Sequence, residues 1–544
     1  MRLGVDVGGT NTDAVLMDGT EVVAWAKRPT SSSVSRGVAA TINAVLEKAG
    51  IEGREVSCVM IGTTQFANAL VQRRGLQEVG VIRLASPSGE ALPPMTGWPA
   101  DICRCMGETV FLLPGGYEFD GREISAFDEK RVRDAARALK RRGVRAAAIT
   151  SVFGPVNPAM EKRAAAIIRN EDDGIAITTS SAIGRIGFLE RENTAILNAA
   201  LSQLAGEVIA SFQAALRNLG MTVPLYVSQN DGTLISAAQA TRYPVMTIGS
   251  GPTNSMRGAV LLTGLGDAIV MDVGGTTTDI GALANGFPRE SSIAEDIGGV
   301  GTNFRMPDIH SIGLGGGTRI HLDRAALNSD PLDDEAFEVG PDSVGFDITT
   351  EALVFGGSTL TASDIAIAAG CTGFGNPELL PPITAGVIRA VMTRFRHMLE
   401  DGIDRIKTTP GSAPIIAVGG GNFLIPESLK GAASVIRPEH AAVANAIGAA
   451  IAQVGAQVEQ IVTYETTPRA EALEALRKEA CARVVAAGGE ASSVRVADIE
   501  EVFLSYLPGR AAQIRVKAIG DLAIGGERGN VAAYDDMTKA HHVA

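Results

Sequence analysis

The chain has 544 residues, a formal net charge of −13, and only 4% aromatic side chains. At roughly 100–200 residues per domain, this length indicates about three or four domains. The negative charge and the scarcity of aromatic side chains argue against a protein that binds nucleic acid through phosphates and stacked bases.

The cysteines and the N-terminal residues favour a cytoplasmic protein. The five cysteines, at positions 58, 103, 105, 371 and 481, fit neither a disulfide framework nor a zinc site. Met1 and Arg2 lead directly into LGVDVGG, which is too short and too glycine-rich for a signal peptide. We find no apolar run of about 18 residues and therefore expect no membrane span.

A glycine-rich turn between two apolar segments opens the chain. The segments LGVDV (3–7) and AVLMDG (14–19) have the residues typical of strands, and the turn reads DVGGTNTD (6–13). Two adjacent glycines let the backbone bend sharply and approach a ligand closely. The amide groups of such a turn form a concave anion site. The sequence therefore predicts a β-hairpin with a phosphate-binding tip.

Residues 125–170 predict a helix, a strand and a second helix. FDEKRVRDAARALKRRG is amphipathic and has cations near its end, where they favour a helix terminus. VRAAAITSVFG has the composition of a buried strand, and NPAMEKRAAAIIRN begins the second helix. We expect an α/β subdomain inserted in the first lobe, preceded by a loop rich in proline and glycine at 86–121.

Nearly the same eight residues return about halfway along the chain. DVGGTTTD (272–279) differs from the first copy at one position, where Thr277 replaces Asn11. It again lies between apolar segments, AIVMDV (268–273) and IGALANG (280–286), which predict a second hairpin. Two related lobes that face each other could hold one nucleoside triphosphate from both sides, which would explain why the loop occurs twice.

The two hairpins supply most of the candidate nucleotide contacts. The leading aspartates, Asp6 and Asp272, can hold a hydrated Mg²⁺. The trailing aspartates, Asp13 and Asp279, could orient a water or a hydroxyl group in catalysis. The turn residues expected around the phosphates are Gly8, Gly9, Thr10, Asn11 and Thr12 in the first hairpin, and Gly274, Gly275, Thr276, Thr277 and Thr278 in the second.

Two later segments complete a recognisable order of elements. APIIAVGGGNFLIP (413–426) predicts a strand that ends in a glycine loop, and VANAIGAAIA (443–452) predicts a helix of small residues that can cross another helix closely. This order resembles the actin, sugar-kinase and heat-shock-chaperone superfamily of two-lobed ATPases. The resemblance implies an α/β, two-lobed actin-like (ribonuclease H-like) fold that binds ATP and Mg²⁺. It also implies an adenosine loop formed by Gly419, Gly420, Gly421 and Asn422.

Seven further segments carry a narrower resemblance. They are IGTTQFANAL (61–70), SSAIGRIGFLERENTAILNAAL (180–201), QNDGTLIS (229–236), IGSGPTNSMRGA (248–259), HSIGLGGGTRI (310–320), VGPDSVG (339–345) and FGGSTLTASDIAIAAG (355–370). Together they resemble the hydantoinase/oxoprolinase family, in its hydantoinase A or acetone-carboxylase β type of subunit. With the hairpins they cover residues 1 to about 450. Ile61 and Met160 stand where many members have histidine, which indicates a distinct branch with its own substrate.

These segments contain the remaining candidate site residues. His310, next to the loop Gly315, Gly316 and Gly317, is a candidate catalytic residue, although a lone histidine more often has a packing role. The three glycines are further candidates for nucleotide contacts. Thr63, Thr64 and Asn68 offer neutral donors and acceptors that suit an amide or carbonyl substrate.

The expected domains follow the order of the motifs. Residues 1–175 form a first lobe with the first hairpin and the inserted subdomain. Residues 176–455 form a second lobe with the second hairpin, the adenosine loop and the connecting helix. Residues 456–544 form a small α+β C-terminal region, with a charged helix at 471–488 and two strands at 501–522 around Pro508 and Gly509.

The family resemblance implies an ATP-dependent hydrolase subunit. It would activate, by phosphorylation, the carbonyl group of a cyclic amide or imide such as a hydantoin, 5-oxoproline or a lactam. Ring opening would fall to a second catalytic subunit, so we expect a homo- or hetero-oligomer. Two alternatives stay open: a subunit that phosphorylates a ketone or bicarbonate in an acetone carboxylase-like enzyme, and a nucleotide-driven activator module without a small-molecule substrate.

Overall fold

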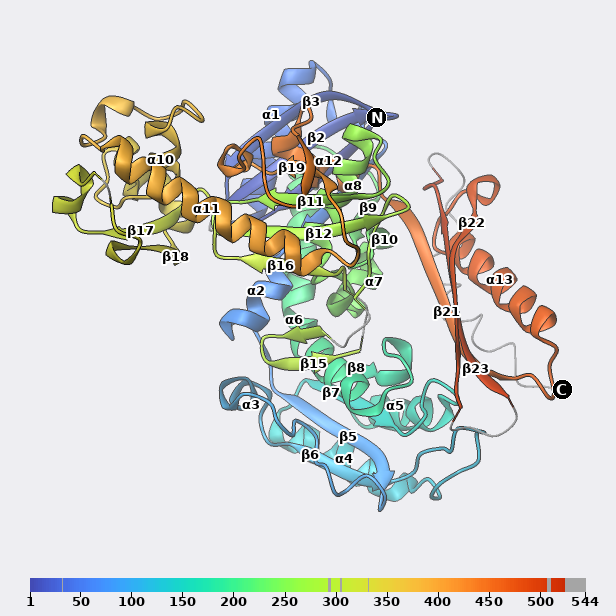
Figure 1. The fold of residues 1–544 in the computed structure, drawn as a ribbon. Coiled ribbons are helices and arrows are strands. Elements are labelled where there is room, and N and C mark those ends of the chain that lie inside the picture. Colours follow the sequence, from blue (N-terminus) through green and yellow to red (C-terminus); the bar gives the residue numbers. More distant parts are fainter. Residues whose placement is uncertain (32, 292–294, 304–305, 331, 506–509, 524–544) are drawn as a thin grey trace.

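The structure is a computed structural model that describes residues 1–544 except 32, 292–294, 304–305, 331, 506–509 and 524–544. It has the predicted two-lobed α/β architecture (Figure 1). Both hairpins lie in the upper part of the view, in two separate sheets. The inserted subdomain lies at the bottom, a smaller subdomain around β17 and β18 at the left, and the C-terminal strands at the right.

The first hairpin belongs to a nine-stranded sheet. Its two strands pair antiparallel along their whole length, and β4 lies parallel to β1 on the other side. The order is β22-β23-β21-β10-β9-β4-β1-β2-β3. The strands are β1 (Arg2–Val7), β2 (Asn11–Asp18), β3 (Glu21–Pro29), β4 (Cys58–Thr63), β9 (Leu225–Ser228), β10 (Thr233–Ser236), β21 (Gln453–Thr463), β22 (Arg495–Phe503) and β23 (Ala511–Gly520).

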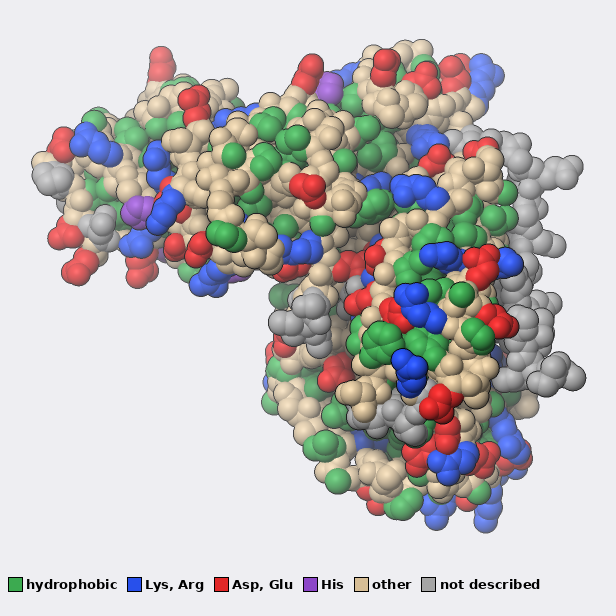
Figure 2. All heavy atoms as spheres, turned by 45° about the vertical axis from the view of Figure 1, so that its right-hand side comes forward, with side chains coloured by type: hydrophobic (Ala, Val, Ile, Leu, Met, Phe, Trp, Pro, Cys, Tyr) green, Lys and Arg blue, Asp and Glu red, His purple; other side chains and the backbone are tan. Residues whose placement is uncertain are grey.

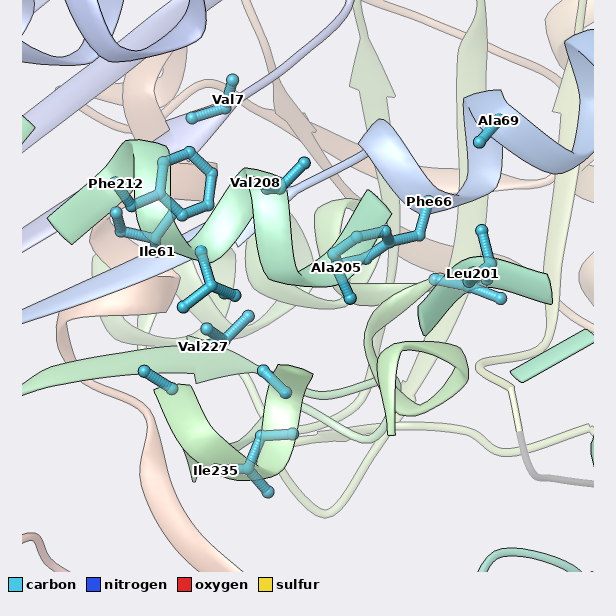
Figure 3. Close-up of a cluster of buried hydrophobic side chains, with 14 of the residues drawn as sticks. Val7, Ile61, Phe66, Ala69, Leu201, Ala205, Val208, Phe212, Val227 and Ile235 are labelled. Atoms are coloured by element: carbon cyan, nitrogen blue, oxygen red, sulfur yellow. The ribbon is translucent and has the colours of Figure 1, made fainter. Parts of the chain in front are cut away.

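Apolar side chains fix the central strands of this sheet against three helices, α1 (Val34–Ala49), α2 (Gln65–Gln72) and α6 (Phe188–Asn218). Figure 3 shows Val7, Ile61 and Val227 of the sheet gathered around Phe212 and Val208 of α6. This packing fixes the ends of β1 and β4, where the hairpin tip begins.

Helix α6 is long and apolar enough to cross a membrane by length and composition alone, and 61% of its most apolar stretch is buried inside the structure. The core helix of a globular protein has the same properties. Helix α6 packs against α1 and the inserted subdomain, and its Phe212 and Val208 lie in the core of the first sheet (Figure 3).

The inserted subdomain contains the predicted helix–strand–helix, but the segment 86–121, which we expected to be a loop, also forms a short helix and one strand of the sheet. Its all-parallel sheet has the order β6-β5-β7-β8. Helix α4 begins after Asp128, whose side chain accepts a hydrogen bond from the backbone N–H of Arg131, and ends at Gly143 in the left-handed conformation. The elements are β5 (Val79–Ser86), α3 (Ala100–Met106), β6 (Val110–Pro114), α4 (Glu129–Arg142), β7 (Ala146–Ser151), α5 (Ala159–Glu171) and β8 (Ala176–Thr179).

The second hairpin lies in a six-stranded sheet of order β13-β12-β11-β19-β20, in which β16 also pairs with β12. Helix α11 (Ala385–Ile406) packs on β12 and β16 and leads out to the small subdomain at the left of Figure 1. The other elements are β11 (Ala268–Val273), β12 (Thr278–Ala284), β13 (Phe287–Pro288), β14 (Glu295–Ile297), β15 (Val300–Thr302), β16 (Ile309–Ile312), β17 (Thr318–Leu322), β18 (Phe337–Ser343), α10 (Ala362–Ala368), β19 (Ala413–Val418) and β20 (Ala432–Ile436).

Two helices, α8 (Ser250–Thr263) and α12 (Ala444–Ala450), connect the lobes and cross at backbone distance. A Cβ atom on Gly448 of α12 would lie 1.8 Å from the carbonyl oxygen of Asn254, and one on Gly258 of α8 would lie 2.0 Å from that of Ala444. A Cβ on Gly4 of β1 would lie 2.1 Å from the carbonyl oxygen of Ala446. Glycine is therefore required at each contact, and the predicted close crossing of α12 is confirmed.

The C-terminal region forms strands β21 to β23 and helix α13 (Arg469–Ala486). Its strands extend the first sheet, because β21 runs parallel to β10. Buried Lys517 of β23 lies 2.8 Å from Asp231, which follows β9. In the face shown in Figure 2, basic and acidic side chains are interspersed. The predicted turn at Pro508 and Gly509 and residues 524–544 lie outside the described residues.

Candidate active site

The two hairpins have equivalent turns. The backbone N–H of Gly8 donates to the carbonyl of Asn11 at 3.0 Å, and that of Gly274 donates to the carbonyl of Thr277 at 2.9 Å. Asp6 pairs with Asp13 across the first hairpin, and Asp272 pairs with Asp279 across the second. Paired residues of an antiparallel ladder point to the same face, so each hairpin presents two carboxylates together.

In the first hairpin, helix α12 holds the two carboxylates together. The side-chain amide of Asn445 donates to Asp6 Oδ2 at 2.9 Å and to Asp13 Oδ2 at 3.0 Å. Lys27 of β3, which pairs with Asp13 in the sheet, forms an ion pair with Asp13 Oδ2 at 2.6 Å. The Oδ1 atoms of Asp6 and Asp13 are buried and have no partner.

Burial makes Asp6 a weak acid. Desolvation, followed by the charges of Asp13 and Asp272, raises the pKa of Asp6 to about 7. The nearby charge of Lys27 and the hydrogen bond from Asn445 act in the opposite direction but do not compensate. Aspartates of both lobes therefore lie close enough to Asp6 for their charges to act on its pKa.

In the second hairpin, neutral hydroxyl groups hold the carboxylates. Ser255 of α8 donates to Asp272 Oδ2 and Ser311 of β16 donates to Asp279 Oδ1, each at 2.5 Å. Desolvation raises the pKa of Asp272, and it raises the pKa of Asp279 to about 6 with a further contribution from the charge of Asp272. Asp279 is therefore more basic than an ordinary aspartate, and a carboxylate of this kind suits proton transfer near neutral pH.

The tips of the hairpins meet between the lobes. A Cβ atom on Gly275 would lie 2.9 Å from Thr10 Cγ2 and 3.0 Å from Thr10 Oγ1. Gly9, Thr276 and Thr277 are exposed, whereas Thr12 and Thr278 are buried next to the trailing aspartates. Gly8, Asn11 and Gly274 are half-buried at the turns.

Both predicted glycine loops pack on the second hairpin. The backbone N–H groups of Gly316 and Gly317 donate to the carbonyls of Gly274 and Gly275 at 3.0 and 2.7 Å, and buried Gly315 lies against Thr276. The N–H of Gly421 donates to the carbonyl of Val273 at 2.8 Å.

The loop after β19 also reaches the carboxylates and the first lobe. A Cβ on Gly419 would lie 2.3 Å from Asp272 Oδ1, and one on exposed Gly420 would lie 3.9 Å from Lys27 Nζ. The side-chain amide of Asn422 donates back to the carbonyl of Gly419 at 2.8 Å and holds the loop. The chain thus brings this loop and both hairpins to one place.

The carboxylates fit a hydrated divalent cation. Mg²⁺ prefers oxygen ligands and usually keeps several waters while it bridges one or two carboxylates to phosphate. The partnerless Oδ1 atom of Asp6 offers such a ligand, and Asp272 of the other lobe lies near enough for its charge to raise the pKa of Asp6. Among the residues that the structure describes, no group of three or more His, Cys, Asp or Glu side chains forms a closed metal site.

The predicted substrate residues lie beside the first hairpin. Buried Thr63 ends β4, opposite Val7, and Thr64 donates through its hydroxyl to the carbonyl of Val7 at 3.4 Å. Asn68, one turn into α2, donates to the Thr64 hydroxyl at 3.4 Å. The start of α8 faces them, because a Cβ on Gly251 would lie 3.4 Å from Thr64 Cγ2.

A buried carboxamide adds to this end of the site. The side chain of Asn254 is fully buried, and neither of its polar atoms has a partner. It lies over Gly62, whose Cβ would meet Asn254 Nδ2 at 2.4 Å and Asp6 Oδ1 at 2.6 Å. Glycine at position 62 therefore leaves the space in which these two polar groups approach each other.

His310 lies apart from the carboxylates. It pairs with Ile280 across β12 and β16, and its ring lies near Gly402 of α11, where a Cβ would be 3.8 Å from His310 Cδ2. Desolvation and the charge of Arg405 lower its pKa. Side chains alternate along a strand, so Ser311, the next residue, reaches Asp279 from the other face.

Sequence reasoning missed Lys27, which belongs to no recognisable motif, and also Ser255 and Ser311, which lie inside two of the family segments but were not singled out. Asn445 carried a signal, since it is a polar residue in an otherwise small and apolar helix. Asn254 lies inside a predicted family segment but was not singled out.

Two cavities lie in the second half of the chain. One, which has no room for a water molecule, lies between α8 and the second hairpin and is lined by Pro252, Met256, Asp272 and Asp279. The other, of about 1030 Å³, lies around β17 and β18 and contains none of the hairpin residues. The hairpin chemistry therefore identifies the candidate site, although the second cavity is larger.

Comparison with known families agrees with the sequence motifs. Residues 2–172 match the hydantoinase/oxoprolinase N-terminal region, and residues 191–386 match the hydantoinase/oxoprolinase family itself. The chain belongs to the hydantoinase/oxoprolinase family. The two matches together cover well over half of the chain and include both hairpins.

Two curated relatives of this family member are 26% identical to it. They are the caprolactamase subunit alpha of Pseudomonas jessenii, over 77% of this chain and 65% of the relative, and the acetophenone carboxylase gamma subunit of Aromatoleum aromaticum, over 69% and 53%. The chain thus spans about half to two thirds of these relatives.

Solved structures show the same fold. The ATP-dependent caprolactamase from Pseudomonas jessenii superposes with a TM-score of 0.75 at 21% identity, over 96% of this chain and 88% of that one. A nucleotide-free acetone carboxylase superposes with a TM-score of 0.70 at 19% identity, over 97% and 88%.

Proposed function

We propose that this hydantoinase/oxoprolinase family member is the nucleotide-binding subunit of an ATP-dependent enzyme that activates a small cyclic amide or imide. The observation that carries the proposal is the meeting of two equivalent hairpins, each with two buried or half-buried carboxylates, between two lobes. The names of its relatives, an ATP-dependent caprolactamase and its alpha subunit, support this class of substrate.

Phosphorylation solves the chemical problem of such a substrate. Resonance stabilises the amide C–N bond against attack by water. The carbonyl oxygen would form a bond to the γ-phosphorus of ATP while the bond to the β–γ bridging oxygen breaks, which yields ADP and an activated O-phosphorylated imidate. A base must take the ring N–H proton in the same step. Bound Mg²⁺ supplies charge neutralisation for the phosphates.

The residues of this chain divide into groups with different tasks. Asp6 and Asp272 would hold the hydrated Mg²⁺, and the backbone amides of residues 8–12 and 274–278 would surround the phosphates. Gly315 to Gly317 and the loop 419–422 would line the adenosine side. Thr64 and Asn68 would orient the substrate amide next to Asp6.

The two trailing aspartates differ in their partners. Asp13 is paired with Lys27, whereas Asp279 accepts a hydrogen bond from the neutral Ser311. We therefore assign the acceptance of the substrate proton to Asp279, held in position by Ser311. Ring opening by water, which releases phosphate and completes the reaction, would occur in a partner subunit.

A ketone substrate is the second candidate. The relationship to an acetophenone carboxylase subunit favours it. A ketone would be phosphorylated through its enolate oxygen, which again needs a base beside the carbonyl group. ATP turnover by such an enzyme would depend on bicarbonate, whereas turnover by a cyclic amidohydrolase would not.

ADP release by the purified chain with Mg-ATP tests the proposal. The chain would be assayed with hydantoins, lactams, cyclic imides and ketones, with and without the protein encoded beside it, and with and without bicarbonate. We expect stimulation by a cyclic amide without bicarbonate. Stimulation by a ketone only with bicarbonate would favour the carboxylase reaction, and a flat response with the partner present would favour an activator module.

A further inference from the structure

Lys27 lies where the two lobes meet. Its ammonium group is 2.6 Å from Asp13 in the first lobe, and it lies next to Gly420 of the second lobe. The Lys27 side chain is 25% exposed, so it is partly buried and still reaches solvent. No sequence motif points to this residue, which lies near the end of β3.

The surroundings of Lys27 carry an excess of negative charge. Its charge lowers the pKa of Asp6 and of Asp272, against the larger effect of burial, so its field reaches carboxylates of both lobes. Among the described residues, Asp6, Asp272 and Asp279 form no ion pair of their own, and the Oδ1 atoms of Asp6 and Asp13 have no partner. One lysine therefore faces several carboxylates that a divalent cation would also neutralise.

We propose that Lys27 is a counter-ion of the hairpin carboxylates. In the nucleotide-free protein its ammonium group partly neutralises the carboxylates that Mg²⁺ would otherwise neutralise, and it moves to the phosphates when Mg-ATP binds. The inference rests on the proposed nucleotide site. It assigns to Lys27 two successive partners, Asp13 in the empty site and a nucleotide phosphate oxygen in the loaded one.

The local contacts permit such an exchange. When Lys27 leaves, Asp13 Oδ2 still accepts a hydrogen bond from Asn445, so the buried carboxylate keeps a hydrogen-bond donor. A lysine ammonium is a point charge on a flexible stem of four carbons, which can change partners without a change of the backbone. The absence of a side chain on Gly420 leaves the path toward the second lobe open.

The test compares Lys27→Met with wild type, with Lys48→Met as the matched control. Lys48 lies in the same lobe, where it is exposed and bonds to the carbonyl of Trp25 outside the site. Without nucleotide, we expect Mg²⁺ alone at millimolar concentration to raise the Tm of Lys27→Met by about 2 °C or more beyond its effect on wild type, because the carboxylates lack their counter-ion. Lys48→Met should respond like wild type.

The second readout is nucleotide affinity. Loss of a charge-assisted contact should weaken binding of Mg-ATP to Lys27→Met by about 10-fold to 100-fold. Lys27→Arg, which keeps the charge, should respond to Mg²⁺ alone like wild type. If Lys27→Met does not fold, Lys27→Gln makes the same comparison with a neutral donor to Asp13.

The outcomes separate this inference from the proposed function. A wild-type Mg²⁺ response in Lys27→Met refutes the counter-ion, even if nucleotide affinity falls. An enhanced Mg²⁺ response with unchanged nucleotide affinity refutes the transfer to phosphate. Wild-type protein that binds no nucleotide would instead reject the proposed function, while the Mg²⁺ comparison without nucleotide still tests the counter-ion.

Discussion

Asp13 and Asp279 occupy equivalent positions on the two hairpins but have unlike partners, an ammonium group and a hydroxyl group. Their neighbours in the sheets are also equivalent, because Lys27 pairs with Asp13 and Ser311 pairs with Asp279. The repeated sequence thus forms two hairpins of similar geometry. The strand that pairs with each trailing aspartate, β3 in the first sheet and β16 in the second, gives the two aspartates different partners.

Asp279→Asn should lower the rate of phosphoryl transfer by about 100-fold to 10,000-fold while Mg-ATP still binds, because the proton acceptor is lost. In wild type the active form is the carboxylate, so the rate should fall as pH falls through about 6. Single-turnover ADP formation between pH 5 and 8 measures this. If Asp279→Asn kept the wild-type rate and its rate still fell with the same midpoint as pH is lowered, the assignment of Asp279 as proton acceptor would be contradicted.

Ser311→Ala and His310→Ala should differ, because only Ser311 donates to Asp279 while His310 faces α11. We expect Ser311→Ala to reduce ADP formation by about tenfold, in line with the loss of one hydrogen bond to a charged group. His310→Ala should stay within about threefold of wild type. Equal losses in both variants, at equal Tm, would place His310 in the reaction.

Asp6→Asn should stabilise the protein without metal and nucleotide while it abolishes turnover. Because folding raises the pKa of Asp6, ionisation of Asp6 destabilises the folded state, and this effect is complete above about pH 7 and absent below about pH 4. The gain in Tm, about 2 °C or more, should therefore be larger at pH 8 than at pH 5.

Asp18→Asn, an exposed site at the end of the same hairpin, is the control for this comparison. It should change Tm little at either pH. A lower Tm of Asp6→Asn at pH 8 would show that the ionised Asp6 side chain stabilises the empty fold, and it would contradict the argument that burial and neighbouring charges make its ionisation unfavourable.

Gly448→Ala should destabilise the helix crossing, since its Cβ would meet the carbonyl oxygen of Asn254 at 1.8 Å. Overpacking of this kind costs about 1–3 kcal/mol. Gly206→Ala is the matched control, because Gly206 lies within α6 and a Cβ there meets nothing within 4 Å. Alanine in a helix interior should leave its stability unchanged or raise it. Denaturant unfolding that ranks Gly448→Ala at or above wild type would contradict the crossing.

The sequence predicted the local elements of the site well, since each is encoded within a few residues. Both hairpins, the strand at 413–418, the small-residue helix at 444–450 and the helix–strand–helix of the inserted subdomain are all present. The domain boundaries remain a prediction, although strands β9 and β10, at 225–236, pair with the first sheet rather than the second.

The partners of the aspartates could not be predicted in the same way. Lys27 and Ser311 reach them through antiparallel register between strands, and Asn445 reaches them from more than 400 residues away along the chain. Register depends on the whole sheet and not on a local pattern. For the same reason, the alternation that directs Ser311 toward Asp279 and His310 away from it was not visible in the sequence.

Equilibrium binding of Mg-ATP to wild type, Asp6→Asn and Asp272→Ala tests the central claim most directly. Both hairpins are proposed to hold one nucleotide between them, so we predict one bound nucleotide per chain and a loss of affinity in either variant. Asp272→Ala should also abolish ATP turnover while its circular dichroism spectrum stays like that of wild type. Two independent nucleotides per chain, or wild-type binding and turnover in Asp272→Ala, would contradict the account.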